Sequence, residues 1–290
     1  MEVVATCISA LDQPGHDWGE VVAFRAYGNR RRARVVGVNE CVSYLTKGPI
    51  VVVHLDRPHR LNAVVPALVD GMLAALERAR ADEAGAVVLA GRGRAFCAGH
   101  DLKEPAPAED EAAARRRLQR IQDVTRAIRS FPGPVIAAVH GYALGAGAEF
   151  ALGCDLVVAA QDARFGFPEV GVGLSVTGGI SALLPRTVGP VRAKELLFLG
   201  EHLSAEDAHR LGLVNRVVAT GSHEEAALDL AQRLVARPPA ALALAKSLLD
   251  HGVGSTEPRA LDREVDAAIA TMATGEAQSA AEAFQEGSGG

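Results

Sequence analysis

Gly-Tyr-Ala-Leu-Gly-Ala-Gly-Ala-Glu-Phe, residues 141–150, is the part of this chain from which its architecture is most readily inferred. Its small residues allow a ligand to approach the backbone closely, which leaves amide N–H groups free to donate hydrogen bonds to that ligand. Glu149 follows the glycines at what we expect to be the start of a helix. The segment therefore predicts a tight turn that places a carboxyl group beside a backbone binding site.

A second glutamate and a second turn of small residues lie on either side of this segment. Glu169 follows Pro168 twenty residues downstream, beyond a short apolar strand at Leu156–Ala160. Upstream, residues 96–102 read Phe-Cys-Ala-Gly-His-Asp-Leu. Most glutamates lie on protein surfaces, but these two have apolar or small neighbours instead of a charged face. Two carboxyl groups beside two such turns indicate acid–base chemistry next to an oxyanion site.

The composition of the 290 residues restricts the class of protein. Hydrophobic residues make up 49% of the chain, enough for one large core or for a core and a smaller second unit. The net charge of −5 provides no basic field for nucleic acid. No apolar run is long enough to span a membrane, and the first residues lack the pattern of a secretory signal. The four cysteines have no metal-ligand spacing, so we expect reduced thiols and a cytoplasmic protein.

The remaining sequence predicts an α/β fold with largely parallel strands, because short apolar strands alternate with helices. Residues 1–40 have weak periodicity and an arginine cluster, and we expect either a partly disordered N-terminal extension or upstream sequence included by an early start codon. The arginine cluster itself is read as a solvated face, with a phosphate-binding patch as the alternative. We expect a core over 41–230 and a helical region over 231–290. The predicted strands are 42–45, 50–55, 86–90, 134–139, 156–160 and 213–218, and the predicted helices are 64–81, 109–130, 144–152, 179–184, 204–211, 223–236, 238–252 and 257–273.

Five segments, in order, resemble the enoyl-CoA hydratase/isomerase (crotonase) family. The resemblance implies a crotonase-like spiral of ββα turns with a C-terminal helical trimerisation region, assembled as a homotrimer or a dimer of trimers. It also implies acyl thioesters of coenzyme A as substrates, so that coenzyme A is part of the substrate and no separate cofactor or metal is expected. The matching segments are 55–63 (LDRPHRLNA), 93–102 (GRAFCAGHDL), 134–149 (PVIAAVHGYALGAGAE), 164–169 (RFGFPE) and 203–214 (LSAEDAHRLGLV).

The same resemblance assigns roles to individual residues. The backbone amides of His100 and Ala146 would form the oxyanion hole, and each such donor typically contributes about 3–4 kcal/mol. In a hydratase, Glu149 would activate a water molecule and Glu169 would exchange the proton on Cα. Syn addition of water across the 2,3-double bond of an enoyl thioester requires two carboxyl groups that flank one water molecule.

Contacts with coenzyme A are also implied by the resemblance. They involve His59, Arg60 and Leu61 after the Arg-Pro pair, and Ala98 at the adenine. Lys103 is a candidate to bind the phosphates of coenzyme A, because its side chain is a mobile cation directly after the turn that contains His100. A solvated lysine without a ligand is the alternative for Lys103.

Two positions differ from the family pattern. Residues 173–180 read Gly-Leu-Ser-Val-Thr-Gly-Gly-Ile where many hydratases have Pro-Gly-x-Gly-Gly, and we expect Val176 and Thr177 to border the acyl pocket. His140 replaces the usual asparagine, and we expect a histidine at a strand end with a satisfied hydrogen bond.

Several functions remain open alongside hydration. An isomerase or a thioester hydrolase would use the same fold, and a non-catalytic trimeric scaffold would need neither glutamate. A dinucleotide-binding fold is excluded because Phe150 stands where the third glycine of that motif is required.

Overall fold

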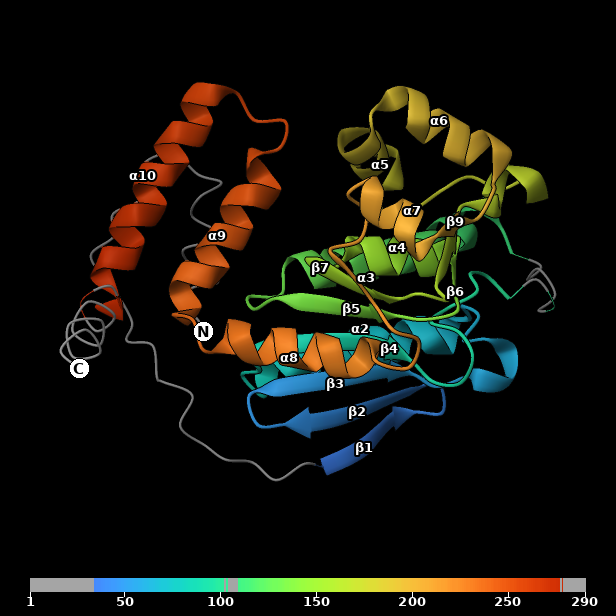
Figure 1. The fold of residues 1–290 in the computed structure, drawn as a ribbon, viewed down its shortest axis with the longest axis horizontal. Helices are drawn as coiled ribbons and strands as arrows, with labels where there is room; N and C mark the ends of the chain where they lie inside the picture. The colour runs from blue at the N-terminus through green and yellow to red at the C-terminus, as the bar shows by residue number, and fades with distance from the viewer. Residues whose placement is uncertain (1–33, 102, 104–108, 277, 279–290) are drawn as a thin grey trace.

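A seven-stranded sheet forms the centre of the molecule in the computed structural model, which describes residues 34–101, 103, 109–276 and 278 (Figure 1). The first three strands of the order β1-β2-β3-β4-β5-β7-β10 pair antiparallel, and the others pair parallel. The predicted strands 42–45 and 50–55 are confirmed, and they form an antiparallel hairpin across Gly48. The strands are β1 (Arg34–Asn39), β2 (Val42–Lys47), β3 (Ile50–Leu55), β4 (Ala86–Gly91), β5 (Val135–Val139), β7 (Leu156–Ala160) and β10 (Arg216–Val218).

The sheet begins earlier than the sequence predicts. Strand β1 pairs with β2 along its length, with a register shift between Gly37 and Asn39, so six residues of the expected extension belong to the sheet. A glycine and an arginine within this short run obscure the alternation by which a strand is recognised. The expectations for the residues before 34 lie outside the described part of the chain.

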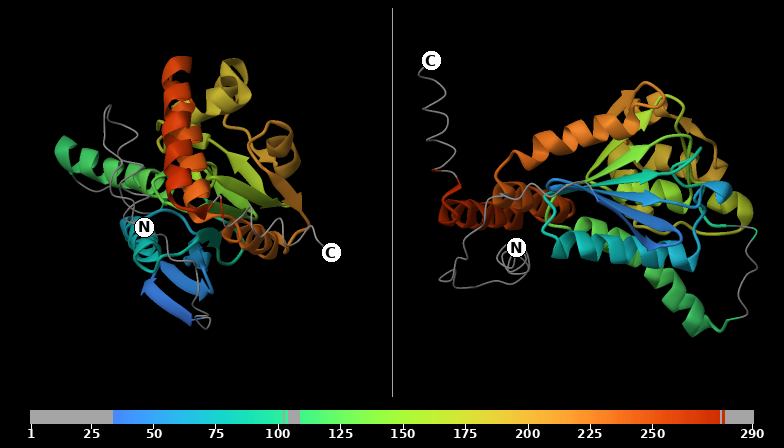
Figure 2. Two further views of the ribbon diagram at one scale, coloured as in Figure 1. Left: turned by 90° about the vertical axis from the view of Figure 1, so that its left-hand side faces the viewer. Right: turned by 90° about the horizontal axis from the view of Figure 1, so that it is seen from below.

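The two faces of the sheet support separate apolar layers, because successive side chains of a strand point to opposite faces. In β3, Val51 and Val53 belong to the layer beneath helices α2 (Pro66–Ala81), α3 (Glu111–Arg129) and α4 (Ala146–Gly153). Ile50 and Val52 belong to the layer beneath α8 (His223–Val235). Both faces are therefore buried, which explains the uninterrupted apolar strands. The views in Figure 2 place the sheet between these helices.

Most predicted helices are confirmed, but two details are wrong. The segment after Gly189 forms a helix, α6, that the sequence did not predict, and α2 starts at Pro66 instead of residue 64. Pro66 favours this start because a proline fits the first helical position. The helices are α2 (Pro66–Ala81), α3 (Glu111–Arg129), α4 (Ala146–Gly153), α5 (Ile180–Val188), α6 (Pro190–Leu199), α7 (Ala205–Arg210), α8 (His223–Val235), α9 (Pro239–Gly252) and α10 (Glu257–Ala273), with 3₁₀ turns η1 (Pro58–Arg60) and η2 (Pro168–Val172).

A small second sheet carries the segment that leads into α4. It consists of β6 (Tyr142–Leu144), β8 (Arg164–Gly166) and β9 (Leu203–Ser204), in which β8 pairs parallel with β6 and antiparallel with β9. Gly145 donates its N–H to the carbonyl of Gly166 at 2.9 Å. This sheet therefore holds the start of α4 beside the chain that leads to η2.

Helices α9 and α10 extend away from the sheet, whereas α8 packs on it (Figure 1). The predicted boundary at residue 230 thus falls inside α8. The division of the chain into a core and a C-terminal helical region remains a prediction.

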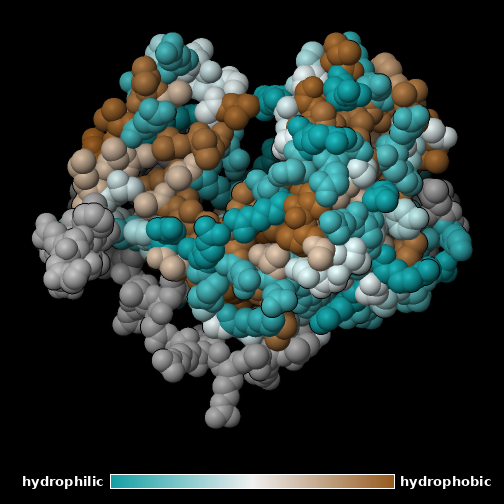
Figure 3. All heavy atoms as spheres, in the orientation of Figure 1, coloured by the Kyte–Doolittle hydropathy of each residue, from teal (hydrophilic) through white to brown (hydrophobic). Residues whose placement is uncertain are grey.

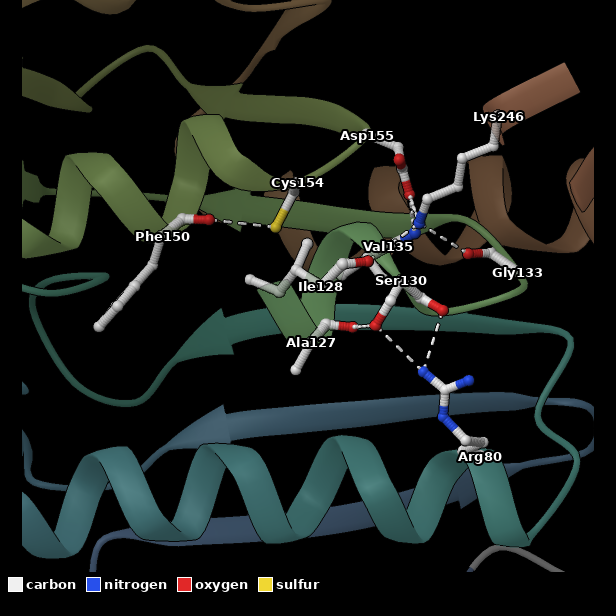
Figure 4. A network of polar contacts seen from close by, with 10 residues as sticks. All are labelled: Arg80, Ala127, Ile128, Ser130, Gly133, Val135, Phe150, Cys154, Asp155 and Lys246. Atoms are coloured by element: carbon white, nitrogen blue, oxygen red, sulfur yellow. Dashed lines mark hydrogen bonds and ion pairs between the residues drawn. The ribbon is translucent and has the colours of Figure 1, made fainter. Parts of the chain in front are cut away.

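A largely buried lysine fastens α9 to the core. Lys246 Nζ lies 2.8 Å from Asp155 Oδ2 and donates to the carbonyls of Ile128 and Gly133 at 3.0 and 3.2 Å (Figure 4). The same Asp155 oxygen accepts the N–H of Val135 at 2.7 Å. Three segments and α9 therefore meet at one ammonium group.

We expect Lys246→Met to lower the free energy of unfolding by about 3 kcal/mol or more, because removing one partner of a buried pair leaves the other charge uncompensated. Chemical denaturation of both proteins measures the difference. Arg192→Met, which breaks an exposed ion pair with Glu195, is the matched control and should cost less than about 1 kcal/mol. Equal losses in the two variants would contradict the anchoring role of Lys246.

Candidate active site

Two turns of small residues, a first turn at residues 96–101 and a second turn at residues 141–147, pack directly against each other. Leu144 donates its N–H to the carbonyl of Cys97 at 3.0 Å, and Cys97 donates to the carbonyl of Tyr142 at 2.9 Å. A Cβ atom on Gly147 would lie 2.1 Å from the Cys97 oxygen, and one on Gly99 would lie 2.8 Å from the Leu144 oxygen. Glycine is therefore required at both positions for the backbones to approach this closely.

The chain before α2 holds the first turn from its other side. Val64 donates to the carbonyl of Gly99 at 2.7 Å and accepts from the N–H of Asp101 at 3.2 Å. Arg57 adds an ion pair with the buried Asp101 carboxylate at 3.3 Å and a hydrogen bond to the Ala63 carbonyl at 2.6 Å. The backbone on both sides of His100 is consequently fixed.

The amides of His100 and Ala146 have no acceptor among the residues that the structure describes. Ala146 is the first residue of α4, where backbone N–H groups have no partner within the helix and carry a partial positive charge. Both residues line the same cavity. The arrangement leaves two donors available to an oxygen atom of a bound molecule.

This cavity, of about 1180 Å³, also contains both predicted glutamates on its wall. The four residues predicted to perform the chemistry thus lie around one space, although they come from three separate parts of the chain. The residues that line it are Glu40, Cys41, Arg57, His59, Val64, Val65, Pro66, Ala67, His100, Asp101, Arg117, Leu118, Ala146, Glu149, Glu169, Leu174, Ser175 and Thr177.

Glu149 lies in α4 with only 1% of its surface exposed. Its Oε1 accepts the backbone N–H of Thr177 at 2.6 Å, and its Oε2 accepts the Thr177 hydroxyl at 2.5 Å. Burial raises the pKa of Glu149, and the two hydrogen bonds from Thr177 counteract that rise. The carboxyl group is thereby held in one orientation.

Glu169 lies in η2 and is 8% exposed. Its Oε2 is buried without a hydrogen-bond partner among the described residues. Burial raises the pKa of Glu169, a hydrogen bond from its own backbone N–H counteracts part of that rise, and the neighbouring Glu149 charge adds to it. A side chain on Gly145 would approach Glu169 Oε1 to 2.9 Å, so this carboxyl group lies over the second turn. The two glutamates therefore occupy different electrostatic environments.

The residues predicted to contact coenzyme A are only partly assembled. His59 lines the cavity, whereas Arg60 and Lys103 are exposed and do not. Ala98 donates its N–H to the carbonyl of Leu61 at 3.0 Å, so these two predicted positions are adjacent. Their contacts with a ligand remain a prediction.

The sequence did not predict the contacts that two residues of the site make. Arg57 lines the cavity and fixes the first turn, and Thr177 binds Glu149 instead of merely bordering the acyl pocket. Thr177 is 28 positions from Glu149, and no local pattern signals such a contact. Val176 packs against the core and is not on the cavity wall.

His140 lies at a strand end as predicted, but only one of its two ring nitrogens has a hydrogen-bond partner, because Nδ1 is buried without one among the described residues. Its Nε2 lies 2.9 Å from the carbonyl of Gly93, and its ring stacks on His223 at 4.4 Å. It does not line the cavity. Among the described residues, no group of three or more histidine, cysteine, aspartate or glutamate side chains could hold a metal ion.

The fold and the cavity define an α/β protein with paired carboxyl groups beside two free backbone donors. The family model for enoyl-CoA hydratase/isomerase matches residues 46–288. The chain belongs to this family. Crotonase-family enzymes act on thioesters of coenzyme A, and the fold is the crotonase fold, as predicted from the sequence.

Individual relatives agree with this assignment. The chain is 41% identical to a human enoyl-CoA hydratase domain-containing protein 2, mitochondrial, over 68% of this chain and 70% of that protein. It is 35% identical to the short-chain-enoyl-CoA hydratase of Clostridium acetobutylicum over 83% and 92% of the two chains. A crystal structure of an enoyl-CoA hydratase from Polaromonas sp. JS666 superposes with a TM-score of 0.81 at 35% identity, covering 84% of this chain and 96% of that one.

Proposed function

We propose that this protein is an enoyl-CoA hydratase that adds water syn across the 2,3-double bond of a 2-enoyl-CoA thioester. The observation that carries the proposal is the convergence of Glu149, Glu169 and the amides of His100 and Ala146 on one cavity. A relative named as a short-chain-enoyl-CoA hydratase supports the same reaction.

In the proposed reaction, the thioester oxygen accepts hydrogen bonds from the amides of His100 and Ala146. Glu149 takes a proton from water as the water oxygen bonds to Cβ, and the electrons of the double bond move toward the carbonyl to give enolate character. Glu169 then supplies a proton to Cα, and the two carboxyl groups exchange their protonation states overall. Donors fixed before the reaction stabilise this charge without reorganisation.

An acyl-CoA panel tests the proposal. Crotonyl-CoA and longer 2-enoyl-CoA thioesters should lose the absorbance of the conjugated enoyl thioester as the 3-hydroxyacyl product forms. Movement of the double bond without hydration would identify an isomerase, and release of free coenzyme A would identify a thioester hydrolase. No turnover of any member of the panel would favour a scaffold and reject the proposal.

His100→Ala should retain most of the activity, within about tenfold of the wild-type kcat/KM, because the proposed oxyanion donor is a backbone amide. The same hydration assay measures it. The imidazole is neutral near pH 7, because burial and Arg117 lower its pKa. A loss as great as that caused by removing a catalytic carboxylate would show that the imidazole participates.

The proposal includes a homotrimer or a dimer of trimers built through α9 and α10. The lobe formed by these helices carries exposed hydrophobic residues, as Figure 3 shows from one side. Association of copies would remove them from water. The residues are Leu249, Val253, Leu261, Val265, Ile269 and Met272, exposed by 47–73%.

Contacts of coenzyme A with His59, Arg60, Leu61, Ala98 and Lys103 also belong to the proposal. We also propose that the protein is cytoplasmic. In the described part of the chain, no helix has the length and apolar character needed to cross a membrane.

A further inference from the structure

We propose that Thr177 is the positioning residue that gives the two carboxyl groups of this site different roles. Thr177 donates one hydrogen bond to each oxygen of Glu149, through its backbone N–H at 2.6 Å and through its hydroxyl at 2.5 Å. Glu169 receives no such donor on its buried Oε2. The inference rests on the proposed hydration and extends it to a residue outside the pair.

The backbone of the loop, and not only the Thr177 side chain, holds this contact in place. Gly178 adopts φ +58°, and a Cβ atom there would lie 2.6 Å from Glu149 Cβ, so the loop backbone packs directly on the glutamate. Thr177 accepts the N–H of Ile180 at 3.0 Å, which ties it to the start of α5. The loop is therefore fixed against Glu149 on both sides of Thr177.

Donors to a carboxylate stabilise its charged form, whereas burial stabilises the neutral form. Glu149 accepts two hydrogen bonds from Thr177, whereas Glu169 has only its own backbone N–H as a donor and its Oε2 is buried without a partner among the described residues. In this proposal Glu149 is therefore the carboxyl group that ionises more readily and accepts a proton from water. Glu169 lies in the cavity beside that negative charge, so it keeps its own proton more readily. Because a carboxylate has about four acceptor positions, Glu149 retains lone pairs for the water molecule.

Other titratable groups near Glu149 do not produce this asymmetry. Cys97 is a neutral thiol, since burial raises its pKa to about 12, and His100 is neutral for the reason given above. Arg129 of α3 lies beside Gly179, and it is not among the groups that shift the pKa of either carboxyl group. The remaining titratable groups on the cavity wall are Glu40, Cys41, Arg57, His59, Asp101 and Arg117.

The first test is the pH dependence of hydration in Thr177→Val, which removes the hydroxyl but keeps the branched shape. Loss of a donor raises the pKa of the general base, so the acid limb of kcat/KM should move to higher pH. We expect kcat/KM to fall about 10- to 100-fold on the acid side, with a smaller loss at higher pH. Thr177→Ser should restore the position of the limb. A loss independent of pH, or a serine variant shifted as far as the valine variant, would overturn the inference.

Thr187→Val is the matched control. It makes the same chemical change at an exposed residue of α5 that does not line the cavity and whose hydroxyl donates to the carbonyl of Leu183 at 3.0 Å. We expect it to leave the acid limb at the wild-type pH. An equal shift in this variant would show that loss of any threonine hydroxyl produces the effect, which contradicts a specific role for Thr177.

A second measurement requires neither turnover nor a Thr177 variant. Glu149→Gln and Glu169→Gln each leave one carboxyl group in the cavity, whose titration can be followed by infrared or carbon NMR spectroscopy. Glu149 in the Glu169→Gln protein should lose its proton at a lower pH than Glu169 in the Glu149→Gln protein. The reverse order would overturn the inference, even if the wild-type enzyme hydrates enoyl thioesters. Absence of hydration by a wild-type protein with the expected order would reject the proposed function alone.

Discussion

Glu149→Gln and Glu169→Gln should each lower kcat for enoyl thioester hydration by about 10²- to 10⁴-fold, the usual contribution of a positioned general acid or base. Glutamine has nearly the shape of glutamate, but its amide neither accepts a proton from water nor delivers one to Cα. Both side chains are buried on the wall of one cavity. The change therefore removes proton transfer and leaves most of the packing in place.

The measurement is initial-rate hydration of crotonyl-CoA, with thermal unfolding to establish that each variant is folded. Glu206→Gln, the same chemical change at an exposed position in α7, should retain the wild-type rate. The double variant should lose much less than the product of the two single losses, since groups that act as a unit are not additive. Wild-type rates in both single variants would refute the roles assigned to the two glutamates.

The sequence predicted those parts of the site that depend on local pattern. Glu149 follows a turn of small residues and Glu169 follows Pro168, both among apolar neighbours. The turns themselves could be recognised because close backbone approach requires glycine at particular positions such as Gly99 and Gly147. The central strands were equally clear, because strands buried on both faces are continuous apolar runs. Physical constraints that act within a few residues leave a visible trace in the sequence.

Contacts between distant segments left no such trace. Thr177 was expected to border the acyl pocket, but nothing in its neighbourhood indicated the two hydrogen bonds to Glu149. Lys246 and Asp155 are 91 positions apart, and each reads as an ordinary surface charge in its own segment. In contrast, α6 was overlooked although Pro190 at its start and Gly200 at its end are helix-boundary signals.

Gly147→Ala should lower kcat/KM by about 10³-fold or more, although the substitution adds only a methyl group. That methyl group would lie 2.1 Å from the Cys97 carbonyl oxygen and 2.8 Å from the Cys97 carbonyl carbon. These are backbone atoms, so the two turns must move apart. The amides of His100 and Ala146 belong to these turns, and loss of one oxyanion donor alone typically costs 10²- to 10³-fold.

The same strain should lower the free energy of unfolding by about 1–3 kcal/mol, the usual cost of overpacking. Gly252→Ala is the matched control, because a Cβ atom there meets nothing within 4 Å and the residue ends helix α9. It should leave hydration unchanged and unfold with equal or slightly greater stability. Each variant adds one methyl group to the wild-type protein. A loss of activity in Gly147→Ala alone would therefore tie activity to the contact between the turns. Full activity of Gly147→Ala would mean that catalysis does not depend on the close packing of the Cys97 carbonyl against α4.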